Sequence, residues 1–165
     1  MKNYLNLIPL FLYLGFVSCG HDHDHHHGHE HGDKEHGSGG HAHHAPHGGT
    51  LVLLGDHGTG FHLELLLDEN GTLEAYVLDG EAENFVRISQ EEFEIETKGE
   101  EGAEKTISLE AVADPATEET VGDTSFFRAN EQVEGITSFE GNLKSLSIKG
   151  KKFENVSFRF PEGNE

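Results

Sequence analysis

The most distinctive chemistry in this sequence belongs to its histidines. There are 14 histidines in 165 residues, and 12 of them fall in the run HDHDHHHGHEHGDKEHGSGGHAHHAPH, which covers residues 21–47. Neutral imidazole is a good ligand for divalent transition metals near pH 7, because its unperturbed pKa is about 6.5. The candidate metal ligands are therefore His21, His23, His25, His26, His27, His29, His31, His36, His41, His43, His44 and His47, with His57 and His62 further along the chain.

The spacing of these histidines favours several exchanging sites over one defined cage. From His21 to His31 every second residue is a histidine, and an extended strand would hold such neighbours roughly 6.6 Å apart. Zinc takes about four ligands at about 2.0–2.1 Å, so the chain must bend, which Gly28, Gly32 and Gly37 allow. The run has almost nothing apolar to bury, so we expect a tract that is disordered without its metal.

The first 19 residues have the features of a secretion signal. Lys2 supplies the positive start, and Tyr4–Val17 is an apolar run that is shorter than the roughly 20 residues needed to span a bilayer. The run ends in Phe16-Val17-Ser18-Cys19, which resembles the bacterial lipobox, with Phe16 in place of the usual leucine. The resemblance implies a lipidated Cys19 and an anchor in the bacterial cell envelope, facing the periplasm or the cell surface, with the outer membrane expected. The alternative is an ordinary secretion signal with an incidental cysteine.

Charge and sulfur content narrow the choice of ligand and partner. The net charge is −20 with histidine neutral, which repels nucleic acid and raises the local concentration of cations. Met1 and Cys19 are the only sulfur-containing residues, so no intramolecular disulfide is expected and a mature chain would offer only imidazole and carboxylate ligands. These ligands suit Zn(II), Ni(II), Co(II) or Cu(II) rather than Cu(I), and we expect zinc.

From about Thr50 the composition changes to alternating apolar and polar residues. In residues 61–68, Phe61, Leu63, Leu65 and Leu67 share one face, while His62, Glu64 and Asp68 take the other. Turns are predicted at residues 68–71 and 149–151, and the pattern as a whole predicts an antiparallel β-sandwich. The expected organisation is a signal (1–18), a disordered tract (19–48), a β-sandwich domain (49–162) and a tail (163–165). The predicted strands are Leu51–Leu54, Phe61–Asp68, Thr72–Asp79, Phe85–Ile88, Glu92–Thr97, Lys105–Val112, Thr124–Ala129, Leu143–Lys149 and Lys152–Phe160.

Four short motifs carry a resemblance. They are HGGTL at residues 47–51, GDH at 55–57, HLEL at 62–65 and LEAYVLDG at 73–80. Together they resemble a small β-domain found in His-rich lipoproteins of the bacterial envelope, and a similar domain begins the periplasmic adaptor subunits of heavy-metal efflux pumps. The resemblance implies an association with metal handling. The chain lacks the coiled-coil hairpin and lipoyl-like regions of a full adaptor.

The β-domain also offers candidate ligands of its own. Asp56, His57, His62 and Glu64 are expected near one hairpin end, whereas His47 would lie about 20 Å away along an extended chain unless a loop returns it. The alternative is that His57 is a loop residue and His62 lies on the polar face of a strand. The acidic pair Glu118-Glu119 is expected to be solvated surface.

The motifs of common enzymes are missing from the sequence. It has no GxSxG, no phosphate-binding glycine loop and no HExxH, so we do not expect an enzyme. We expect a lipid-anchored protein that binds divalent metal for buffering, capture or delivery. The alternatives are an interaction module that docks on a metal efflux or uptake complex, and a structural surface lipoprotein with no metal role.

Overall fold

The computed structural model describes residues 43–99, 102–133 and 137–164, and these residues form an all-β fold. Every pairing between its eight strands is antiparallel, which confirms the predicted fold class. The predicted signal and most of the predicted tract lie outside the described residues. The strands are β1 (Thr50–Leu54), β2 (Phe61–Leu67), β3 (Thr72–Leu78), β4 (Glu92–Lys98), β5 (Glu104–Ala111), β6 (Phe126–Gln132), β7 (Phe139–Ile148) and β8 (Lys151–Phe160).

One predicted strand is wrong. Residues 85–88 were expected to form a strand, but they make only two isolated bridges, from Phe85 to Leu78 and from Ile88 to Thr124. Val86 and Ile88 still point into the core. These two apolar residues are therefore buried although residues 85–88 form no continuous ladder of strand hydrogen bonds.

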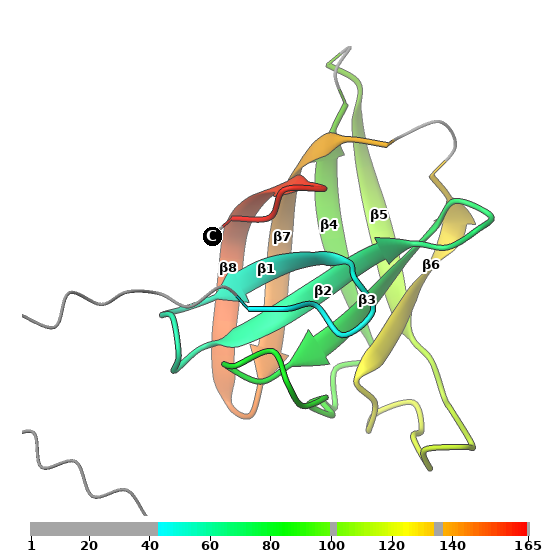
Figure 1. Cartoon of the computed structure of the whole chain (residues 1–165). Helices are drawn as coiled ribbons and strands as arrows, with labels where there is room; N and C mark the ends of the chain where they lie inside the picture. Colours follow the sequence, from blue (N-terminus) through cyan, green and yellow to red (C-terminus); the bar gives the residue numbers. More distant parts are fainter. Residues whose placement is uncertain (1–42, 100–101, 134–136, 165) are drawn as a thin grey trace, which may run out of the picture. The chain divides into compact units, whose positions relative to one another are not determined.

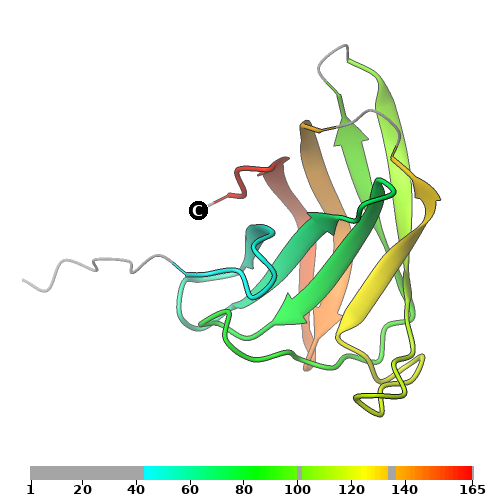
Figure 2. The same cartoon turned by 45° about the vertical axis from the view of Figure 1, so that its right-hand side comes forward.

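The eight strands form one continuous sheet that folds over on itself. Their order is β1-β2-β3-β6-β5-β4-β7-β8, and β1–β3 lie in front of β4, β7 and β8 in both views (Figures 1 and 2). The two halves of the sheet thus face each other as the layers of a sandwich do. The sheet is nearly closed, because the first and last strands of this order approach each other.

The gap between β1 and β8 is bridged by the residues that follow β8. The side-chain oxygen of Asn164 accepts a hydrogen bond from the Leu53 amide at 2.7 Å, and the Asn164 amide group donates to the Leu53 carbonyl at 3.2 Å. The Thr50 hydroxyl donates to the Pro161 carbonyl. Asn164, which the sequence analysis placed in a tail, therefore contacts the first strand of the sheet.

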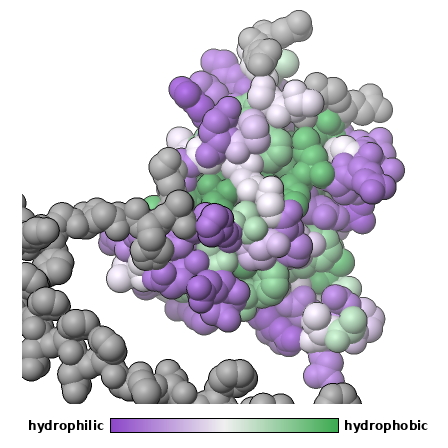
Figure 3. All heavy atoms as spheres, viewed as in Figure 1, coloured by the Kyte–Doolittle hydropathy of each residue, from purple (hydrophilic) through white to green (hydrophobic). Residues whose placement is uncertain are grey.

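The core lies between the two halves of the sheet. Alternate residues of each strand face inward, as on β4, where Phe93, Ile95 and Thr97 are buried between exposed neighbours. On β2, Leu63 and Leu65 are fully buried, and Phe61 and Leu67 pack against the same core. Hydrophobic residues show in the middle of the face drawn in Figure 3, between hydrophilic ones.

The two predicted hairpin turns are present. At residues 68–71 the Asp68 amide donates to the Thr72 carbonyl, and Gly71 has a φ of 78°. Between β7 and β8, Lys149 and Gly150 both have positive φ, 46° and 81°, as a two-residue hairpin turn of the favoured twist requires. Asp68 caps the first turn further, because its carboxylate accepts from the amides of Asn70 and Thr72.

Candidate functional site

The face of β2 opposite the core is covered by the chain that precedes β1. This face carries His62 and Glu64, and both side chains are fully buried. A turn between Ala45 and Gly48, closed by a 3.0 Å backbone hydrogen bond, lays residues 43–49 over it. His43 and His47, which precede the predicted boundary at residue 49, thus contact the β-domain.

Glu64 holds this segment in place. One of its carboxylate oxygens accepts from the backbone amides of His47 and Gly49, at 2.8 and 3.0 Å. The other oxygen lies 2.9 Å from Nδ1 of His47. A buried carboxylate needs such partners, because leaving it without them would cost several kcal/mol. His47 therefore contacts the middle of β2, because the turn at residues 45–48 returns it there.

Aromatic rings pack around His47 on the same face. Its ring lies 4.2 Å from that of Tyr76 and 5.6 Å from that of Phe85, measured between centroids. Tyr76 in turn stacks on Phe126. Partial burial and the negative charges of Glu74 and Glu64 raise the pKa of the Tyr76 hydroxyl above its usual value.

Three histidines from different segments meet at the other end of this covering segment. Nε2 of His43 lies 3.0 Å from Nε2 of His57, in the loop between β1 and β2. The His43 ring lies 4.7 Å from the rings of both His57 and His62, measured between centroids. The cluster runs from buried His62 through half-buried His43 to exposed His57, so one side of it faces solvent.

Backbone carbonyls fix the tautomers of two of these rings. Nδ1 of His62 is 3.1 Å from the Asp79 carbonyl, and Nδ1 of His43 is 3.1 Å from the Glu81 carbonyl. A carbonyl can only accept, so Nδ1 must carry the proton in both rings. The lone pair of each neutral ring is then on Nε2, the nitrogen that His43 directs at His57.

Both carbonyls belong to residues 79–84, the loop that follows β3. The carboxylate of Asp79 accepts from the amides of Glu83 and Asn84 and from the side chain of Asn84. Burial of Asp79 acts to raise the pKa of its carboxyl, but the hydrogen bonds from Asn84 and the amides of Glu83, Asn84 and Glu81 outweigh it, so the pKa lies below its usual value.

This loop touches the loop that carries His57. A Cβ added to Gly80 would lie 3.1 Å from the carbonyl oxygens of Gly58 and Gly60. The absence of a side chain at Gly80 thus lets two backbones approach closely. On the same side, a carboxylate oxygen of Glu81 lies 3.9 Å from the position of a Cβ on Gly58.

The structure rearranges the candidate ligands expected from the sequence. His57 and His62 do come together, and the sequence missed that His43 joins them. Glu64 does not belong to this group, because its carboxylate accepts hydrogen bonds from His47 and Gly49. Asp56 is exposed, and its backbone carbonyl accepts hydrogen bonds from amides of the turn that follows it. His44 is exposed beside His43. The remaining predicted site residues, Cys19, His21, His23, His25, His26, His27, His29, His31, His36 and His41, lie outside the described residues.

The sequence did contain a signal for the buried outer face of β2. The motifs TLVLL in β1 and LELLL at residues 63–67 are nearly continuous apolar runs, which are typical of strands that are covered on both sides. Leu53, a cross-strand neighbour of His62, belongs to the first of these runs, and the other neighbour, Leu78, is also apolar. The face of β2 that carries His62 therefore has apolar neighbours on both adjacent strands.

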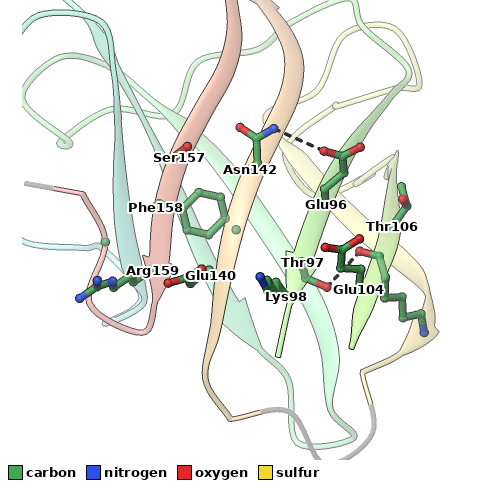
Figure 4. A pocket seen from close by; sticks show the side chains of 13 residues that line it. Glu96, Thr97, Lys98, Glu104, Thr106, Glu140, Asn142, Ser157, Phe158 and Arg159 are labelled. Carbon is green, nitrogen blue, oxygen red and sulfur yellow. Dashed lines mark hydrogen bonds between the residues drawn. The ribbon is translucent and has the colours of Figure 1, made fainter. Parts of the chain in front are cut away.

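A hollow on the domain lies away from the histidine cluster. It has a volume of about 750 Å³ and lies on β4, β5, β7 and β8, where charged side chains of both signs alternate. Figure 4 shows Asn142 directed at Glu96, with the two side chains 3.5 Å apart, and Lys144 also pairs with Glu96 at 2.6 Å. No histidine lines this hollow, so its chemistry differs from that of the histidine cluster.

No group of three or more His, Cys, Asp or Glu side chains in residues 43–99, 102–133 and 137–164 is already arranged to hold a metal ion. The same residues contain no helix long and apolar enough to cross a membrane.

Comparisons with known proteins give no further guide. No family model, no characterised protein and no solved structure matches this chain.

Proposed function

We propose that this protein binds divalent transition metal, zinc first, by means of its histidine-rich tract and the part of that tract that lies on the β-domain. In this proposal it is anchored in the bacterial envelope through Cys19 and buffers, captures or delivers the ion there. The resemblance to envelope domains associated with metal handling supports the proposal.

The observation that carries the proposal is the density of imidazole in one short segment. Twelve histidines lie within residues 21–47, together with acidic residues that attract cations. A spacer between an anchor and a domain needs only polar residues, so this composition favours a ligand role. His43, near the end of this run, also lies next to two further histidines, His57 and His62, on the β-domain.

Zinc titration by calorimetry tests the proposal. We would compare the soluble mature chain, starting at Gly20, with a variant in which the nine tract histidines before His43 are replaced by serine. We expect several ions per mature chain with micromolar or tighter affinity, and fewer ions after the replacement. Lowering the pH below about 6 should release the ions, because protons compete for the imidazole lone pairs.

Absence of zinc binding by the unaltered mature chain near neutral pH would overturn the proposal. Binding that is the same in number and affinity after the replacement would also overturn the role of the tract. The nine replaced residues are His21, His23, His25, His26, His27, His29, His31, His36 and His41.

A further inference from the structure

We infer that His43, His57 and His62 form a discrete single-ion site on the β-domain, distinct from the exchanging sites of the tract, with Glu81 beside it. The inference deepens the proposed function and rests on it. It assigns a tetrahedral ion such as Zn(II) to ligands from the segment before β1, from the loop between β1 and β2, and from β2 itself.

The distances are close to those of a zinc site. Two nitrogens bound to one tetrahedral ion at about 2.0–2.1 Å lie about 3.3–3.4 Å apart, and the centroids of two such rings lie roughly 5 Å apart. The observed Nε2–Nε2 distance between His43 and His57 is 3.0 Å, and both centroid distances from His43 are 4.7 Å. For the pair His43 and His57, the two Nε2 atoms need to separate by only a few tenths of an ångström. His62 is placed by its ring centroid alone, and no group of three ligands is already arranged for an ion in the described residues.

The hydrogen bonds of two rings match a pattern that is common among histidine ligands. Histidines that bind metal usually donate their other ring N–H to a carbonyl or a carboxylate. His43 and His62 both do so, to the carbonyls of Glu81 and Asp79. Their Nδ1 protons are therefore fixed by backbone carbonyls, and Nε2 is the nitrogen of each ring that carries the lone pair.

His57 can adjust to the ion. In the metal-free cluster, Nε2 of His57 must donate its proton to Nε2 of His43, because the latter already carries a lone pair. His57 is exposed, so water can move that proton from Nε2 to Nδ1. The ion then takes the place of the proton between the two rings. Because that proton stays on His57, binding to the neutral imidazoles releases no net proton.

The surroundings supply negative charge and exclude soft metals. Glu81 lies on the loop that orients two of the rings, and its carboxylate approaches Gly58, next to His57. An oxygen there can complete four-coordination or offset the charge of the ion. Three imidazoles with a carboxylate and no sulfur suit Zn(II) or Co(II).

The test separates this site from the tract. In the mature chain with the nine tract histidines replaced by serine, we expect one zinc or cobalt ion per chain, with the strong visible absorption of tetrahedral Co(II). His43→Gln and His57→Gln should each weaken binding by at least ~10–100-fold, since losing a ligand should cost no less than losing an outer partner of one. His44→Gln, at the exposed neighbouring position, should leave binding unchanged.

Each outcome decides between the site and the proposed function. No binding by the tract-substituted chain, while the unaltered chain binds several ions, would overturn the site and leave the function standing. One-ion binding that survives both His43→Gln and His57→Gln would place the site elsewhere and overturn it as well. No binding by either chain would overturn both. Circular dichroism and thermal unfolding of each variant verify that the fold is kept.

Discussion

Glu64 is a charged residue in the middle of a strand, yet its side chain is fully buried. It accepts two backbone amide hydrogen bonds and one from the His47 ring, all from the segment before β1. We predict that Glu64→Ala lowers the free energy of unfolding by roughly 1–3 kcal/mol, because several donors lose their acceptor. It should also speed hydrogen exchange at the Gly49 amide.

Glu94 offers a matched control for this prediction. It too is a glutamate within a strand, but its side chain is exposed on β4. Glu94→Ala should change the free energy of unfolding by less than about 0.5 kcal/mol. Equal effects of the two substitutions in urea unfolding experiments would show that Glu64 does not hold the segment.

The burial of single polar residues could not be predicted from the sequence. Glu119 was expected on the solvated surface, but it is almost fully buried, where its carboxylate accepts from the amide and hydroxyl of Ser125. Glu64 and His62 were likewise assigned to a polar face. Alternation along a strand tells which residues share a face, but it does not tell whether a later loop covers that face.

At the scale of elements, the loop of residues 79–84 connects the fold to the histidine cluster. Its carbonyls orient two rings, and Asp79 holds its shape through Glu83 and Asn84. The pKa of Asp79 is lower in the folded chain than its usual value of 3.8. The charged carboxylate therefore stabilises the fold above about pH 4, and this contribution is lost as the pH falls through the lowered pKa.

We predict that Asp79→Asn costs roughly 1 kcal/mol at neutral pH, as the loss of one charge-assisted hydrogen bond implies. The difference between the two proteins should stay constant down to about pH 4 and then shrink, because the unaltered protein loses its own charge there. Urea unfolding of both proteins at a series of pH values measures this difference in the free energy of unfolding. A difference that is unchanged at pH 3 would contradict the role of the charge.

Strands were predicted better than loops because their signal is local. A few consecutive residues are enough to predict the alternation of Phe93, Ile95 and Thr97 on β4. The same is true of the turn at Lys149-Gly150. Residues 85–88 failed because their apolar character comes from packing against distant strands. The meeting of His43, His57 and His62 was unpredictable for the same reason, since it depends on how the segment before β1 and the β1–β2 loop fold against β2.

At the scale of the whole domain, the sheet depends on its last residues to cover its first strand. Asn164 pairs with both backbone groups of Leu53, and Gly163 approaches Leu51 so closely that a Cβ would lie 2.3 Å from its carbonyl oxygen. We predict that Asn164→Ala frees the edge of β1 and promotes association at high concentration, because exposed strand edges pair with one another. Sedimentation velocity would detect it, with Glu162→Ala as the control at an exposed neighbouring position.

A monomeric Asn164→Ala protein at every concentration tested would show that the edge is protected in another way. Removal of residues 161–165 should have a larger effect than the single substitution, since it also removes the partner of the Thr50 hydroxyl.

The covered edge of β1 bears on how copies of this protein would interact if they were crowded on a membrane. A lipid anchor would confine many copies to two dimensions, at a density far above that of the same protein in free solution. Under such crowding an open strand would be a template for fibres that grow from copy to copy. Residues 161–164, placed over that strand, would keep each anchored copy from pairing with its neighbours at this edge.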